Sequence, residues 1–145
     1  MDELRFTVPG EARGKGRPRA TARKGFVSLY TDAATVKYEK SVLTHALAAL
    51  DGRRPFDIAL SMIVVVRVEP PASASKRLTA EMLSGQVFPA KRPDLDNIIK
   101  AVSDALNGHI YTDDALIVHL VSRKIYAAKP GVDVCIRPAV PIGLS

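Results

Sequence analysis

The residues best suited to chemistry are five aspartates that lie close together in the sequence: Asp94, Asp96, Asp104, Asp113 and Asp114. They stand out because the protein as a whole is basic, with 21 Lys and Arg against 15 Asp and Glu. Two of them form an Asp-x-Asp pair and two are adjacent. Carboxylate oxygens are the ligands that Mg²⁺ prefers, and two or three suffice because this ion keeps several waters. The pattern therefore indicates a divalent cation that a phosphate-bearing partner could share, as in metal-dependent enzymes that act on nucleic acid.

A lysine adds to this interpretation. Lys100 lies one helical turn after Asp96, where its ammonium could steady a carboxylate cluster or neutralise charge that develops on a phosphate. Taken alone, Asp96 could be an ordinary helix cap, and Asp113 and Asp114 could occupy a solvated turn. The combination of both acidic pairs with Lys100 favours a metal and phosphate site.

A helix is predicted between the two acidic pairs, from about residue 96 to residue 107. Its apolar positions share one face: Ile98, Ile99, Val102, Ala105 and Leu106. Asp94 and Asp96 lie at its beginning, and Asn107-Gly108 is a typical end. Because a helix of about 12 residues is about 18 Å long, the pair at 113–114 must return by a loop and strand to reach the first pair, or a partner subunit must contribute.

The elements that support this helix include several strands. Residues 3–8 alternate between apolar and polar side chains, which predicts a half-buried strand. Residues 57–67 are β-branched and nearly all apolar, as expected for a central strand covered on both faces. Two more strands are predicted over residues 115–127 and 131–137, with a turn at Lys129-Pro130-Gly131 between them.

Two further helices complete the prediction. One runs from about residue 33 to 50, with Asp32 as its N-cap. Its apolar stripe comprises Val36, Leu43, Leu47 and Leu50. A shorter helix is predicted over residues 75–84. These elements predict an α+β fold, with residues 1–145 forming a single small domain in which three helices pack on a mixed or antiparallel sheet.

Charge and composition limit the class of partner. A net charge of +6 and a pI of about 9.7 favour a polyanion such as nucleic acid, although solubility alone also accounts for a basic protein. The single cysteine, Cys135, excludes an intrachain disulfide and a Cys-based zinc site. No signal peptide is apparent, and the longest apolar run, Met62–Val66, is too short to span a membrane. We expect a cytoplasmic protein whose partner is neither a membrane nor a small molecule.

A basic segment near the N-terminus is the leading candidate for holding DNA. Residues 11–24 contain two glycines and a single acid, which predicts a mobile loop with little to bury. The triplet Gly16-Arg17-Pro18 resembles an AT-hook, a minor-groove element, but contact with backbone phosphates is the favoured alternative. The candidate phosphate contacts are the six basic residues of this loop and three more along the chain: Arg13, Lys15, Arg17, Arg19, Arg23, Lys24, Lys91, Arg92 and Lys124.

The acidic stretch also resembles a known family signature. The runs KRPDLDNIIK (91–100), DALNG (104–108) and YTDD (111–114) are similar to the signature of the RusA family, the Holliday junction resolvases of bacteria and their phages. The likeness extends more loosely over about residues 4–137. It implies a RusA-like fold and a Mg²⁺-dependent endonuclease that resolves four-way DNA junctions by paired symmetric nicks in DNA recombination and repair.

The resemblance assigns roles residue by residue. The matching positions that carry catalysis in the family are Asp94, Asp96, Lys100 and Asp114. The metal ligands would be these three aspartates together with Asp113, while Asn97 and Asp104 would support them. This chain departs from the family by having Leu116 where Gln is common. The resemblance further implies Mg²⁺ as the cofactor, for which Mn²⁺ could substitute, and a symmetric homodimer with two equivalent sites for a four-way junction.

Two other functions are open at this point. One is a catalytically inactive module that binds branched DNA, and the other is a Mg²⁺-dependent nuclease that acts on flaps or forks. Retention of the acidic residues and of Lys100 argues against the first. The sequence alone does not separate the second from a junction resolvase.

Overall fold

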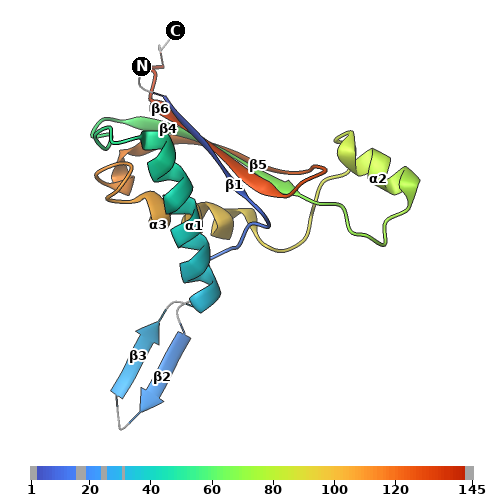
Figure 1. The fold of residues 1–145 in the computed structure, drawn as a ribbon, viewed down its shortest axis with the longest axis horizontal. Coiled ribbons are helices and arrows are strands. Elements are labelled where there is room, and N and C mark those ends of the chain that lie inside the picture. The colour runs from blue at the N-terminus through green and yellow to red at the C-terminus, as the bar shows by residue number, and fades with distance from the viewer. Residues whose placement is uncertain (1–2, 16–18, 24–25, 31, 143–145) are drawn as a thin grey trace.

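A mixed four-stranded sheet forms the centre of the molecule. The computed structural model describes residues 3–15, 19–23, 26–30 and 32–142 (Figure 1). The strand order is β1-β6-β4-β5, formed by Leu4–Pro9, Gly131–Pro138, Leu60–Val68 and Ile117–Tyr126. β6 pairs antiparallel with both β1 and β4, whereas β4 pairs parallel with β5. The predicted single α+β domain with a mixed sheet is confirmed.

Two helices cover one face of this sheet, and the core lies between them and the strands. These are α1 (Ala33–Leu50) and α3 (Leu95–Leu106), which also pack against each other (Figure 1). On the strand side, the core residues of β4 are the alternate positions that face the helices: Leu60, Met62, Val64 and Val66, each at most 1% exposed. The apolar stripe predicted for α3 from the sequence is largely buried, since Ile98, Val102 and Leu106 are each 0% exposed.

The other face of the sheet corrects the prediction for the central strand. Ile63 and Val65 of β4 point away from the helices and are only half-buried. No helix among the described residues covers this face (Figure 1). A run of apolar residues in β4 predicted burial on both sides, but the helices of this small domain suffice for one side only.

The buried stripe of α1 also differs from the predicted one. Val36 and Leu47 were expected inside but are 37% and 44% exposed, and of the predicted stripe only Leu50 is buried. The residues that face the core are Thr35, Tyr38, Val42, Ala46 and Leu50. Hydropathy ranks Leu47 above Ala46, but α1 packs closely on α3 and β1, and small side chains permit that approach. The bounds predicted for α1 are correct.

Part of the predicted basic loop is a hairpin. β2 (Arg19–Arg23) pairs antiparallel with β3 (Phe26–Tyr30), and the hairpin projects beyond the beginning of α1 (Figure 1). The prediction of a loop over residues 11–24 was therefore wrong for β2, because the aromatic and β-branched residues of β3 provide it with a partner. Arg17 and Lys24 lie outside the described residues, as do the side chains of Arg19 and Arg23.

A third helix stands away from the sheet on an arm. α2 (Lys76–Leu83) begins at Ser75, whose hydroxyl accepts a hydrogen bond from the Leu78 N–H at 3.1 Å. This agrees with the helix predicted over residues 75–84. The arm leaves the sheet after β4 and returns to the beginning of α3 (Figure 1). None of the helices in the described part of the chain is long and apolar enough to cross a membrane.

Candidate active site

The first acidic pair lies where α3 begins. Asp94 is the N-cap residue and Asp96 is in the first turn, and both side chains are exposed. The Asp94 carboxylate makes no capping hydrogen bond, and neither carboxylate has an ion pair or hydrogen bond with the described residues. The partial positive charge at a helix N-terminus stabilises carboxylates there. Both carboxylates are therefore exposed hard-oxygen donors that a divalent cation could use.

The turn before Asp94 is held by a lysine from the edge of the sheet. The Lys124 ammonium donates hydrogen bonds to the carbonyl oxygens of Lys91 and of Pro93, the latter at 3.0 Å. Lys124 lies near the end of β5, so this contact fixes the start of α3 beside the end of that strand. Lys124, which the sequence suggested as a DNA contact, thus donates to main-chain carbonyl oxygens just before the acidic pair.

The second acidic pair lies beyond the opposite end of α3, where Asp113 caps and Asp114 begins a short 3₁₀ helix, η1 (Asp114–Leu116). The Asp113 carboxylate accepts a hydrogen bond from the Ala115 N–H at 3.0 Å, which lowers the pKa of Asp113. The pKa of Asp114 is raised, chiefly by its hydrogen bond with Asp113. The Asp114 N–H donates to the side-chain oxygen of Asn107 at 3.0 Å, which ties η1 to the end of α3.

The two acidic pairs do not meet within one chain. α3 has 12 residues and is therefore about 18 Å long, with one pair at each end. Across residues 3–15, 19–23, 26–30 and 32–142, no group of three or more His, Cys, Asp and Glu side chains could hold a metal ion. Lys100 is exposed and lies one helical turn after Asp96 in α3. The structure thus places Asp94, Asp96 and Lys100 in the first half of α3, at the end opposite to Asp113 and Asp114.

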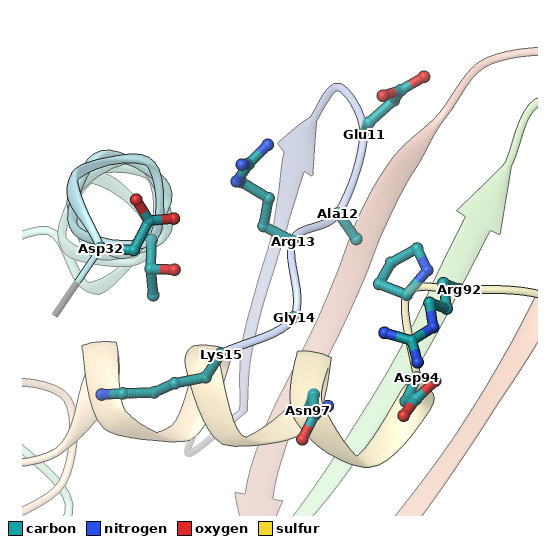
Figure 2. Close-up of a pocket in the computed structure, with 11 residues that line it drawn as sticks. Glu11, Ala12, Arg13, Gly14, Lys15, Asp32, Arg92, Asp94 and Asn97 are labelled. Atoms are coloured by element: carbon teal, nitrogen blue, oxygen red, sulfur yellow. The ribbon is translucent and has the colours of Figure 1, made fainter. Parts of the chain in front are cut away.

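A cleft of about 480 Å³ opens beside Asp94. One wall is the segment of residues 11–15, here called the strap, which runs across α3 in Figure 2. Arg13 of the strap lies on one side of the cleft, and Arg92 lies beside Asp94 on the other side (Figure 2). Asp32, at the beginning of α1, also lines it. The cleft therefore has one guanidinium group, that of Arg92, beside the exposed Asp94 and a second, that of Arg13, on its opposite side (Figure 2).

Lys15, at the end of the strap, pairs with two carboxylates. Its ammonium lies 2.7 Å from the Asp104 carboxylate of α3 and 3.0 Å from that of Glu39 in α1. Burial lowers the pKa of Lys15, but the hydrogen bonds with Asp104 and Glu39 outweigh this effect and hold the pKa above its usual value. The part that Glu39 plays here had no signal in the sequence, because 24 residues separate it from Lys15.

Comparison with known proteins identifies the family. A family model described as "Endodeoxyribonuclease RusA" matches residues 9–137. A relative from Bacillus subtilis (strain 168), "Uncharacterized protein YqaN", is 39% identical over 141 residues, which cover 94% of this chain and 97% of the relative. Nucleases of the RusA family are generally metal-dependent. With a match over most of its length, the chain belongs to the RusA family of endodeoxyribonucleases.

Proposed function

We propose that this protein is a Mg²⁺-dependent endodeoxyribonuclease that resolves four-way DNA junctions by paired symmetric nicks, in DNA recombination and repair. The observation that carries the proposal is the pair of exposed carboxylates, Asp94 and Asp96, at the start of α3 in a chain of this family. Lys100 and Arg92 flank the pair in the sequence. This combination suits a phosphodiester, because cations beside the reacting phosphate stabilise the charge that develops on it.

Asp94 and Asp96 would hold the metal ion, and Asp114 with Asp113 would complete its ligands. The bound ion would supply Lewis-acid stabilisation of the phosphate and a water of lowered pKa. Two carboxylates at one helix start fit Mg²⁺, which takes one or two protein carboxylates and keeps waters. Lys100 would neutralise charge on the phosphate. Asp113 and Asp114 of the same chain lie at the other end of α3, so these two ligands would have to come from outside that chain.

A homodimer supplies them if two copies pair along β5. β5 is an edge strand, and it exposes Val118 (63%), Leu120 (46%) and Val121 (43%). An unpaired edge strand with apolar side chains is a template for another strand, and antiparallel pairing of a strand with its own copy satisfies a two-fold axis. A second copy of this chain is therefore the partner that suits this edge.

Such pairing would complete the site with residues from both copies. A two-fold axis at His119 pairs each β5 position with the position equally far from 119 in the other copy, so Asp114, three residues before β5 begins, would lie toward the end of the other copy's β5 that carries Lys124. Lys124 holds the turn that precedes Asp94. The pairing would therefore bring Asp114 of one copy toward Asp94 and Asp96 of the other. Two such sites per dimer suit a substrate that is cut by two symmetric nicks.

DNA would be held mainly through its phosphates. Arg13 and Arg92 line the cleft beside Asp94, and Lys91 is exposed next to it. Two more predicted contacts, Arg19 and Arg23, belong to β2 of the hairpin, and the predicted contacts Arg17 and Lys24 lie outside the described residues. We expect the affinity for junctions to fall steeply with added salt.

The test is cleavage of a synthetic four-way junction, a fork and plain duplex, with and without Mg²⁺. Paired nicks on the junction alone support the proposal, and Asp94→Asn should abolish them while junction binding persists. Binding without cutting by the unaltered protein would identify an inactive branched-DNA module instead. Cutting of forks or flaps at equal rates would identify a nuclease of broader structure selectivity.

A further inference from the structure

We infer that Lys15 is a positioning residue that clamps the strap onto α3, in place of the DNA contact that its sequence context suggests. The inference rests on the proposed function, because what it positions is Arg13 and the DNA-binding hairpin relative to Asp94. A lysine within a basic segment would ordinarily be read as a phosphate contact. The direction of this ammonium, toward two carboxylates of the protein itself, points to a different role.

The charged contacts of Lys15 join three elements. Its ammonium contacts Glu39 of α1 at 3.0 Å and Asp104 of α3 at 2.7 Å. All three side chains are largely shielded, at 19%, 21% and 31% exposed. Shielded pairs are screened by salt much less than surface pairs. The cluster therefore ties the strap to both helices that cover the sheet, and it leaves the ammonium little surface for a phosphate.

The main chain of the strap follows the same surface. The Lys15 N–H donates a hydrogen bond to the Asn97 carbonyl oxygen at 2.9 Å. At Gly14, a Cβ atom would lie 3.0 Å from the Asn97 Cβ and 3.5 Å from that of Pro93. The 3.0 Å approach is tighter than ordinary van der Waals contact, so a side chain at position 14 would require the strap or Asn97 to shift by a few tenths of an ångström. Asn97 and Pro93 flank Asp94 in sequence, so the strap rests on the turn that presents it.

The position of the strap sets the shape of the cleft. Arg13 lies on the strap side of the cleft, and Arg92 and Asp94 lie opposite (Figure 2). β2 begins only four residues after Lys15, so the position of Lys15 also limits where the hairpin leaves the body of the protein. Loss of the clamp would let Arg13 and the hairpin move relative to Asp94. A misplaced substrate loses rate even when the reacting groups are unchanged.

The first experiment compares Lys15→Met with Arg13→Ala and with Lys40→Met, an exposed lysine of α1 that serves as a matched charge control. We expect Lys15→Met to lower the cleavage rate at saturating junction by about 10- to 100-fold. Its plot of log affinity against log salt concentration should keep the slope of Lys40→Met. Arg13→Ala should flatten that slope by about one unit, as the loss of one phosphate contact does.

The second experiment breaks the cluster from its acidic side. The double variant Glu39→Gln/Asp104→Asn keeps Lys15 and gains two units of positive charge, so a pure charge effect would tighten DNA binding. We expect it to lose cleavage as Lys15→Met does. A triple variant, Lys15→Met/Glu39→Gln/Asp104→Asn, leaves no member of the cluster charged. It should therefore fold even where the single variants do not, and it should also cleave slowly.

Two results would overturn the inference. One is a flatter salt slope for Lys15→Met with an unchanged rate at saturation, which would make Lys15 a phosphate contact. The other is wild-type cleavage by the acidic double variant. Hydrogen exchange separates this inference from the proposed function, since it needs no nuclease activity. The Lys15 amide should be protected in the wild-type protein and lose protection in both sets of variants, and unchanged protection would refute the clamp.

Discussion

Complementation between two inactive variants tests whether the metal site is shared by two copies of the chain. Asp94→Asn and Asp114→Asn should each abolish junction cleavage. In a heterodimer of the two variants, one site would combine both asparagines, and the other would combine both intact aspartates. The heterodimer should therefore recover one working site, although each homodimer has none.

The length of α3 explains why a single chain does not complete the site, and hence how many working sites the heterodimer should have. Its 12 residues span about 18 Å between Asp94 and the residues that hold Asp114, whereas Mg²⁺ binds oxygen at about 2 Å. Side-chain rotation does not bridge such a gap. A heterodimer should consequently have about half the sites of a wild-type dimer, and it should produce single nicks in place of paired ones.

The assay uses the two variants coexpressed with different affinity tags and purified through both tags in succession. Nicking of an end-labelled four-way junction is then measured at saturating protein and Mg²⁺, with each doubly tagged homodimer as the control. An inactive heterodimer, shown to be dimeric by its molar mass, would refute a site shared between copies. Activity in either homodimer would refute the assignment of the residue that it lacks.

Four further results are expected. Gly14→Ala should lower cleavage and the melting temperature, because its Cβ meets α3 at 3.0 Å, and a strap that tolerates alanine with no change in either would contradict the close packing. Tyr111→Phe should cost about 1 to 2 kcal/mol in urea unfolding, because its buried hydroxyl makes two hydrogen bonds. Tyr38→Phe should leave the free energy of unfolding unchanged or raise it, because the buried Tyr38 hydroxyl has no hydrogen-bond partner among the described residues. The same variant should lack one phenol ionisation near pH 12, because burial raises the pKa of Tyr38 to about 12. The pKa of the Cys135 thiol is raised, chiefly by burial, so less thiolate forms at a given pH. Alkylation of Cys135 should therefore require a higher pH than alkylation of a cysteine in free solution.

Local patterns sufficed to predict much of the scaffold. The apolar periodicity of residues 95–106 and the Asn-Gly that follows them define α3, and alternation defines β1. These signals depend on neighbours within one turn of helix or a few residues of strand, so they can be read from the chain. The phase of α1 was mispredicted because it depends on how closely α1 approaches α3 and β1, which hydropathy does not contain.

The sequence by itself determined that this protein has carboxylates and a lysine at one helix start, and that it resembles a metal-dependent nuclease family. Only the tertiary structure decided which of the basic side chains are available to bind DNA. Lys15 and Lys124 look like DNA contacts in the sequence, yet one pairs with Glu39 and Asp104 and the other holds carbonyl oxygens before Asp94. Their partners are distant in the chain, and a charge has the same sequence signature whether it meets solvent, DNA or another part of the protein.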